Sequence, residues 1–266
     1  MDQLNIFGDC HNNLGLKIIL SRFNNIISVG DIAAVDTREY LKRKEVYSGC
    51  WKYRLGKNIK VTKENLLWFD KLNINGWNKQ IKVLNRYKKK LIVNMGNSDQ
   101  RILSWYKLNR SKYLDIIKEI KLIKIDNIQI LFLPYNTRHI NRNILLKIKE
   151  NDFIIMHMPP LKEYYNEVYN QLKQLNSLGI KLIGIHGHIH SDETYKYKIK
   201  DLENFDFITL KAEDTKDGFG YNHEIMSINT ENSKFKFISL IGKEIKPRRL
   251  PEIYLKNKNH WNDFKI

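Results

Sequence analysis

Residues 181–190 read KLIGIHGHIH, a short run of apolar, partly β-branched residues that ends abruptly in glycine and histidine. The apolar part is too short for an ordinary helix and suits a strand that is buried on both faces. Four other stretches have the same form: LNIFGD (4–9), NIISVGD (25–31), KLIVNMGN (90–97) and DFIIMHMPP (152–160). We therefore expect five buried strands, each followed by polar or glycine residues.

Helical patterns lie between these runs. Apolar residues recur at helical spacing over residues 14–23, and residues 62–72 begin with Thr62-x-x-Asn65, which is close to a capping box. A third helix is expected over residues 161–178, where Gly179 would end it. Strands that alternate with helices predict an α/β sheet with parallel pairs.

Two stretches depart from this alternation. IKLIKIDNIQILFLPY (120–135) has apolar runs on either side of Asp126-Asn127 and predicts a β-hairpin. The tail over residues 195–241 favours strands, notably FDFITL (205–210) and KFKFISLI (234–241), and suggests a second sheet packed on the first. The expected fold is α/β, a layered αββα sandwich of two mixed β-sheets flanked by helices.

The chain is expected to form a single domain over residues 1–266, since no repeat or low-complexity linker divides it. Residues 38–89 form a longer connection that carries Trp51, Trp68 and Trp77, and they could be a cap, a lid or simple packing. The basic segment from about residue 243 lacks an apolar pattern and is expected on the surface.

The composition favours a globular protein of the cytoplasm. Hydrophobic residues make up 42% of the chain and charged residues 28%. No apolar run approaches the roughly 20 residues that span a bilayer, so we expect no membrane segment. The first residues do not resemble a secretory signal, and Cys10 and Cys50 provide no disulfide framework.

The net charge is strongly positive. The chain has 46 Lys and Arg against 29 Asp and Glu, a formal charge of +17. Such a surface attracts phosphate-bearing partners, including nucleotides and nucleic acids. The lysines occur together with abundant asparagine and isoleucine, as an A+T-rich coding sequence would also produce, so the charge permits a nucleic-acid substrate without requiring one.

Polar side chains gather where the apolar runs stop. In open α/β sheets the carboxyl ends of strands meet in one crevice, and residues two apart on a strand end project to the same side. Carboxylates, an amide oxygen and imidazoles together suit divalent first-row metals. The candidate ligands, in chain order, are Asp9, His11, Asp31, Asn97, His157, His188 and His190.

The ordered series D-x-H, G-D, G-N, H and G-H-x-H, from Asp9 to His190, resembles the calcineurin-like metallophosphoesterase family. The resemblance implies that Asp9, His11 and His190 hold one metal. It also implies that Asp31 bridges two metals, and that Asn97, His157 and His188 hold the second. Two divalent ions are expected, Mn first, with Fe, Ni or Zn as alternatives.

The family uses a water or hydroxide between its metals as the nucleophile on a phosphate ester. The resemblance therefore implies a metal-dependent phosphoesterase, more specifically a phosphodiesterase. The substrate would be a phosphate ester, with a nucleotide or nucleic acid among the candidates. DNA or RNA nuclease activity is an alternative within this class, and a weakly catalytic scaffold or binding protein is an alternative outside it.

One block departs from the family pattern. Many members read G-N-H-[DE], and the histidine assists the leaving group, whereas this chain reads Gly96-Asn97-Ser98-Asp99. A serine hydroxyl donates a hydrogen bond but is a poor acid at neutral pH. Ser98 is retained as a candidate catalytic residue, and Asp99 as a candidate that orients a metal ligand from behind.

Each of the remaining polar and aromatic candidates has a structural explanation as well as a functional one. His186 is expected to support the metal ligands or to lie in the core, and Cys10 is expected to fill space. Arg101, Arg138 and His139 could contact a phosphate, although each is more often a surface group. The tryptophans and the Tyr164, Tyr165 and Tyr169 cluster could stack on bases, but such aromatics usually belong to the core.

Overall fold

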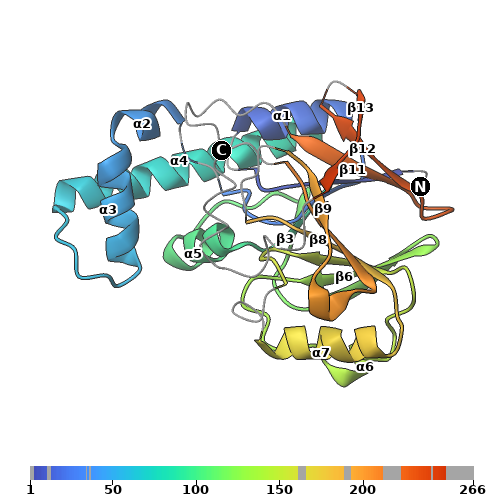
Figure 1. Ribbon diagram of the computed structural model, residues 1–266. Helices are drawn as coiled ribbons and strands as arrows, with labels where there is room; N and C mark the ends of the chain where they lie inside the picture. Colours follow the sequence, from blue (N-terminus) through green and yellow to red (C-terminus); the bar gives the residue numbers. More distant parts are fainter. Residues whose placement is uncertain are drawn as a thin grey trace.

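The structure is a computed structural model that describes residues 3–10, 13–33, 35, 37–160, 166–188, 193–211, 223–240 and 242–249. Two mixed sheets of seven strands each lie at its centre (Figure 1). In this part of the chain no helix is both long enough and apolar enough to cross a bilayer.

The first sheet has the strand order β13-β12-β11-β1-β2-β3-β4, in which β1 to β4 run parallel. Strands β11, β12 and β13 continue it in antiparallel fashion from β1. The strands are β1 (Gln3–Phe7), β2 (Ile26–Ser28), β3 (Leu91–Asn94), β4 (Leu114–Ile117), β11 (Glu224–Asn229), β12 (Phe235–Ser239) and β13 (Glu244–Ile245).

The second sheet has the order β14-β9-β10-β8-β7-β6-β5, with a parallel centre of β10, β8, β7 and β6. Strands β5 and β9 pair antiparallel to it. The strands are β5 (Lys121–Ile125), β6 (Ile128–Leu133), β7 (Phe153–Met156), β8 (Leu182–His186), β9 (Tyr195–Tyr197), β10 (Phe205–Thr209) and β14 (Arg248–Arg249).

Helices cover the outer face of each sheet (Figure 1). Helices α1 and α4 pack on the first sheet, and α6 and α7 pack on the second. The helices are α1 (Asn13–Arg22), α2 (Thr37–Lys42), α3 (Lys44–Arg54), α4 (Lys63–Tyr87), α5 (Asn97–Trp105), α6 (Arg142–Leu145), α7 (Asn166–Ser177) and the short 3-10 turn η1 (Lys200–Leu202). The predicted αββα sandwich is confirmed.

The continuous apolar runs follow from these layers. Ile6 and Ile27 of the first sheet share a buried cluster with Ile155 of the second sheet. Their neighbours Phe7 and Ile26 point the other way, into the cluster formed with α1 and α4. Since successive side chains alternate between the two faces, a strand between a sheet and a helical layer needs apolar residues at nearly every position.

The expected hairpin is confirmed, because β5 and β6 pair antiparallel around Asp126, whose φ is +50°. The expectation that the tail over residues 195–241 forms a second sheet packed on the first is confirmed in part, because the second sheet is present but only half of the tail's strands belong to it. Strands β9 and β10 extend the second sheet, whereas β11 and β12 join the first. The free edge of β1 takes β11 as its antiparallel partner, a long-range pairing that strand propensity does not encode.

The segment over residues 38–89 is helical. Its α3 and the first half of α4 project beyond the sheets, and the Thr62 side chain accepts a hydrogen bond from the Asn65 N–H at 3.2 Å to cap α4 (Figure 1). Trp77 on α4 is buried against the first sheet, so packing accounts for it. Beyond residue 243, β13 and β14 pair with strands β12 and β9.

Candidate metal centre

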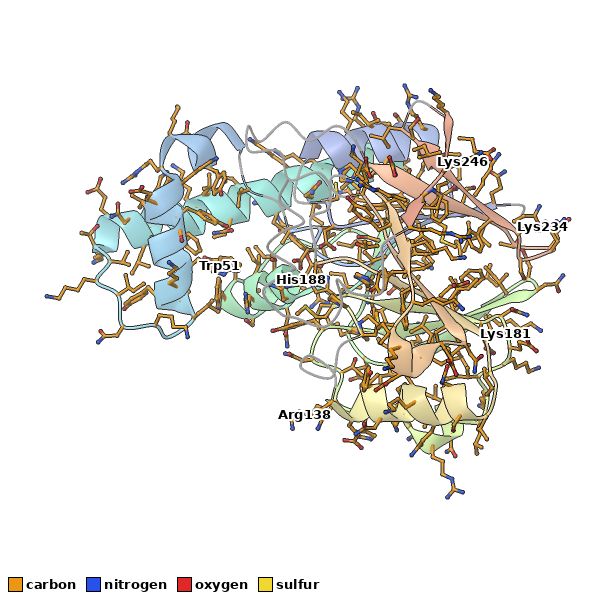
Figure 2. The ribbon with its side chains drawn as sticks, in the orientation of Figure 1. Trp51, Arg138, Lys181, His188, Lys234 and Lys246 are labelled. Atoms are coloured by element: carbon orange, nitrogen blue, oxygen red, sulfur yellow. The ribbon has the colours of Figure 1, made fainter. Side chains whose placement is uncertain are left out.

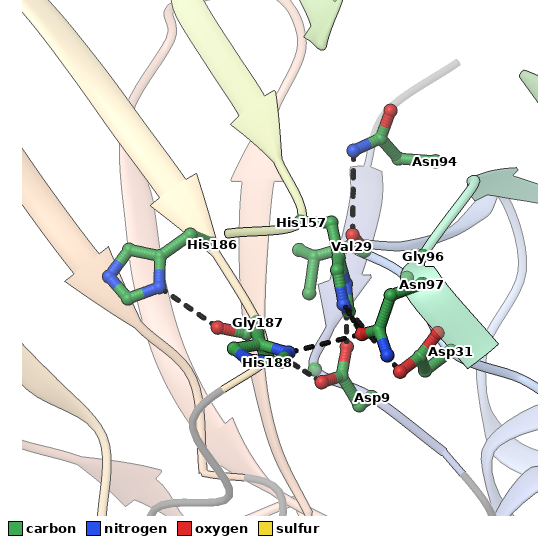
Figure 3. A network of polar contacts seen from close by, with 12 residues as sticks. Asp9, Val29, Asp31, Asn94, Gly96, Asn97, His157, His186, Gly187 and His188 are labelled. Atoms are coloured by element: carbon green, nitrogen blue, oxygen red, sulfur yellow. Dashed lines mark hydrogen bonds and ion pairs between the residues drawn. The ribbon is translucent and has the colours of Figure 1, made fainter. Parts of the chain in front are cut away.

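Five parallel strands end at one edge where the two sheets meet. The turns after β1, β2 and β3 of the first sheet carry Asp9, Asp31 and Asn97. The second sheet contributes His157 after β7 and His188 after β8. Figure 3 shows these five side chains converging on one point. The structure thus brings together five of the seven predicted metal ligands, while His11 and His190 lie outside the described residues.

Four of these side chains approach one another within hydrogen-bonding distance or slightly beyond. Asn97 Oδ1 lies 2.7 Å from His157 Nε2 and 3.1 Å from His188 Nδ1. It is also 3.2 Å from Asp31 Oδ2, which in turn is 3.5 Å from His157 Nε2. Two ligands held about 2.1 Å from one cation at right angles would be about 3.0 Å apart. These four separations are compatible with ligands that share a metal ion, and those that involve Asn97 are compatible with hydrogen bonds as well.

The orientation of the Asn97 amide decides whether its oxygen or its nitrogen faces the other three side chains. With its amide reversed, Nδ2 would donate to His157 Nε2, His188 Nδ1 and Asp31 Oδ2. With Oδ1 inward, either a cation lies between the four atoms or the imidazoles carry their protons on His157 Nε2 and His188 Nδ1 and donate to Oδ1. The donor set of two nitrogens and two oxygens fits a divalent first-row metal.

Asp9 lies on the other side of His157. Its Oδ1 is 3.6 Å from His157 Nδ1, and its Oδ2 accepts a hydrogen bond of 2.6 Å from the backbone N–H of His188. Ligand atoms of Asp9, Asp31 and His157 all lie within 4.8 Å of one another, and all three residues are buried. His157 Nδ1 makes no hydrogen bond within the described part of the chain. Buried carboxylates this close repel one another, and bound cations would offset that repulsion.

The backbone is strained where it presents two of the candidate ligands. Asp31 has φ +32° and His188 has φ +66°, both in the left-handed region that non-glycine residues rarely adopt. Such strain persists only where the surrounding structure fixes it, and it is concentrated at functional sites.

Two glycines allow the ligand loops to approach closely. A Cβ atom on Gly96 would clash with the Asp31 carboxylate, and one on Gly187 would clash with the Asp9 carboxylate. Neither carboxylate could keep its position if these residues carried side chains. The glycines in the G-N and G-H-x-H blocks are thus required by contacts with residues from other blocks.

Asp99 supports the Asp31 loop from behind. It is fully buried, and its Oδ1 accepts hydrogen bonds from the backbone N–H groups of Ile32 (2.9 Å) and Ala33 (2.8 Å). Its Oδ2 accepts from the N–H of Gly96 at 3.3 Å. Burial and the nearby Asp31 carboxylate raise the pKa of the Asp99 carboxyl well above its usual value. Asp99 therefore orients the loops that carry Asp31 and Asn97.

We expect the Asp99→Ala variant to lose about 3 kcal/mol of unfolding free energy, because three buried N–H groups lose their acceptor. The Asp99→Asn variant keeps an oxygen toward Ile32 and Ala33 and should lose only about 1 kcal/mol. Urea denaturation of the metal-free variants measures both. Equal losses in the two variants would show that the backbone hydrogen bonds are not what Asp99 contributes.

Ser98 lies at the position that a histidine occupies in the resembled family. Its backbone N–H donates to Asp31 Oδ1 at 2.8 Å and its hydroxyl donates to Asp31 Oδ2 at 3.0 Å. Both contacts hold the Asp31 carboxylate in place. In this geometry the hydroxyl proton is directed at Asp31, so Ser98 positions a candidate metal ligand, and its direct catalytic role stays a prediction.

His186 points away from the cluster (Figure 3) and is completely buried. Its Nε2 bonds to the Tyr197 hydroxyl on β9, and its Nδ1 lies 3.1 Å from the carbonyl oxygen of Gly187. A neutral imidazole that donates from Nδ1 and accepts at Nε2 satisfies both contacts. Burial is the main cause that lowers the pKa of His186 to about 4. Tyr197 could not be identified from the sequence because strand order alone brings it here.

The depressed pKa of His186 predicts a pH-dependent stability. Its stabilising contribution is complete above the unfolded pKa of 6.5 and is lost as the pH falls toward 4, because only the unfolded state then gains the proton. Between pH 7.5 and pH 5 this group should cost about 2 kcal/mol of unfolding free energy. Urea denaturation of metal-free protein at both pH values should show a smaller drop for His186→Gln. The exposed His139→Gln control should behave as wild type, and a wild-type drop in His186→Gln would contradict the assignment.

The other candidate residues from the sequence lie apart from the cluster or outside the described residues, with one exception. Arg138 and His139 are exposed, and Figure 2 shows Arg138 at the periphery of the molecule. Cys10 is buried in the core beside α1. Tyr164 and Tyr165 lie outside the described residues. Arg101 is the exception, since its Nη1 lies 3.3 Å from the outward amide position of Asn97.

No model of a protein family and no curated protein matches the chain. One solved crystal structure is 10% identical and aligns over 90% of this chain and 99% of its own, with a TM-score of 0.52. A conserved uncharacterized protein from Streptococcus pneumoniae, described as a predicted phosphoesterase, is also 10% identical over 93% of this chain and 96% of its own, with a TM-score of 0.35. The first likeness shows that the fold occurs in another protein, and it extends over nearly the whole chain.

Proposed function

We propose that the chain is a metal-dependent phosphoesterase of the calcineurin-like kind that hydrolyses phosphodiesters. One observation carries this proposal: lone-pair atoms of Asp31, Asn97, His157 and His188 converge at hydrogen-bonding separations from four different strand ends. A cation would satisfy this set as it stands, whereas a purely structural network would need the reversed Asn97 amide or imidazole protons directed at Oδ1 to pair donors with acceptors.

The chain's own residues would divide the work. Asp31, Asn97, His157 and His188 would hold one divalent ion, and Asp9 would hold another with His11 and His190, as the resemblance to the family implies. Two such ions would lower the pKa of a shared water and neutralise charge on the phosphoryl oxygens. Ser98 and Asp99 would fix the Asp31 carboxylate, and the burial of His157 keeps bulk water from one side of the site.

The test is a metal-dependent hydrolysis assay. Protein stripped with EDTA and reloaded with Mn²⁺ should bind about two ions per chain and cleave bis(p-nitrophenyl) phosphate. The His188→Ala variant should lose turnover, whereas the exposed His139→Ala control should keep it. Absence of turnover with Mn²⁺, Fe²⁺, Ni²⁺ and Zn²⁺ alike would refute the proposal.

The substrate class can be narrowed by salt. The charge of +17 would favour an extended polyanion, and binding through many phosphates weakens steeply as salt rises. A mononucleotide or a cyclic nucleotide would show a shallow dependence. Hydrolysis of oligonucleotides and of small diesters, each measured between 50 and 200 mM salt, separates these two cases.

A further inference from the structure

Arg101 lies on the same face of α5 as the ligand Asn97, one helical turn later. It is partly buried. Its Nη1 is 3.3 Å from the Asn97 amide atom that points away from the ligand cluster, which is Nδ2 in this structure and would be Oδ1 if the amide were reversed. When Asn97 directs Oδ1 toward the ligand cluster, its Nδ2 faces Arg101 Nη1. Two donors then lie side by side and need a shared acceptor.

The guanidinium is also supported from behind. Its Cζ lies 5.7 Å from the ring centroid of Trp51 on α3, a distance that allows a cation–π contact. Trp51 in turn packs edge-on against Trp105 of α5 at 5.1 Å and against Phe69 of α4 at 6.1 Å. Figure 2 shows Trp51 where α3 meets α5. The projecting helices thus place an aromatic ring behind a cation at the edge of the candidate metal centre.

Arg101 forms no ion pair with a carboxylate of the described residues, although Asp9 and Asp31 belong to the neighbouring cluster. An arginine that is held by a ring and adjoins a donor amide is arranged to receive an oxyanion. Ser98 does not serve this purpose, since its hydroxyl donates to Asp31.

We propose that Arg101, backed by Trp51, contacts a phosphoryl oxygen of the bound substrate together with Nδ2 of Asn97. The inference rests on the proposed function and deepens it. Arg101 would supply the positive contact to phosphate for which the resembled family commonly uses a histidine at the position of Ser98. Arg101 would replace that histidine in binding the phosphate and stabilising its charge. It would supply no proton to the leaving group, because a guanidinium stays protonated.

The primary test is calorimetric binding of inorganic phosphate to the Mn²⁺-loaded protein, which requires no turnover. Arg101→Ala should weaken phosphate binding roughly 10- to 100-fold, as expected for a charge-assisted hydrogen bond. Arg101→Lys should recover part of the loss, because it restores charge without the planar fork. Trp51→Ala should weaken binding less, by roughly 3- to 5-fold, since it removes only the support. The exposed Arg142→Ala variant is the matched control.

Three outcomes would overturn the inference: unchanged phosphate affinity in Arg101→Ala, loss of bound Mn²⁺ in that variant, or no phosphate binding by the wild type. Loss of Mn²⁺ would mean that Arg101 only orients Asn97. The proposed function fails separately, when the wild type binds phosphate through Arg101 but hydrolyses no phosphodiester. Where hydrolysis occurs, Arg101→Ala should lower kcat/KM for bis(p-nitrophenyl) phosphate in parallel with the phosphate affinity, while the metal content and the unfolding temperature of that variant stay at wild-type values.

Discussion

The Asp31→Asn variant is expected to hydrolyse bis(p-nitrophenyl) phosphate at least roughly 10³-fold more slowly than the wild type, a loss of about 4 kcal/mol in transition-state stabilisation. Asp31 is the carboxylate that faces the shared point of Asn97 and His157. Replacing it with an amide removes a full negative charge from the ligand set at almost constant volume. Cation affinity should fall with it.

The substitution is chosen to spare the fold. The backbone N–H of Ser98 and the hydroxyl of Ser98 both donate to Asp31, and an asparagine oxygen can still accept from the backbone. The metal-free variant should therefore unfold at nearly the wild-type temperature or slightly higher, because a buried charge is gone. Metal content by atomic emission should drop to one ion per chain or fewer.

Asp201→Asn is the matched control. Asp201 is half-exposed and pairs with Lys173, so its loss should alter neither metal content nor turnover. Wild-type turnover in Asp31→Asn would remove Asp31 from the metal centre and, with it, the principal support for the proposed activity.

The local pattern of apolar residues predicted much of this fold, because a strand that lies between the other sheet and a layer of helices must be apolar on both faces. Strand β7, FIIM, is buried at every position, and its apolar, β-branched composition indicates a strand between two apolar layers. The Asp126 turn and the Thr62 cap are likewise local features, which short-range rules describe well.

The pairing of strands that are distant in the chain could not be predicted from the local sequence. The sequence of β11, EIMSIN, is compatible with either sheet, and only the antiparallel register with β1 places it in the first. The short strands β13 and β14 take their partners from opposite sheets for the same reason. Tertiary context decides such elements, and intrinsic propensity does not.

The candidate site divides along the same line. Order and spacing of strand-end residues predicted which side chains would meet, since parallel strands end at a common edge. The residues that act behind them depend on contacts between distant elements. Tyr197 reaches His186 because β9 and β8 both flank β10, and Trp51 reaches Arg101 because α3 folds back onto α5. No local signal marks either contact.

Addition of Mn²⁺ to the EDTA-treated protein is expected to raise its unfolding free energy by about 5 kcal/mol when free metal exceeds its dissociation constant about 100-fold at two sites. For a chain of this length that corresponds to an increase of roughly 10 to 20 °C in the unfolding temperature. The physical reason lies in the buried carboxylates: Asp9 is 2% exposed, Asp31 is 3% exposed and Asp99 is fully buried. Among the described residues, hydrogen bonds and His157 offset part of their mutual repulsion, and bound cations would offset more.

Differential scanning calorimetry at pH 7.5, with and without Mn²⁺, measures this shift. In Asp31→Asn the increase should fall to less than half of the wild-type value, because one carboxylate no longer gains from the ions, whereas Asp201→Asn should keep the full increase. A wild-type unfolding temperature that is the same in EDTA and in excess Mn²⁺ would mean that the cluster binds no cation in the folded state. The convergence of Asn97, His157 and His188 would then have to be explained by the reversed amide of Asn97, with its Nδ2 donating to both imidazoles. That alternative also predicts a smaller unfolding free energy for Asn97→Asp, in which these donors are absent, whereas a metal site predicts that Asn97→Asp keeps its ion and its Mn²⁺-dependent stabilisation.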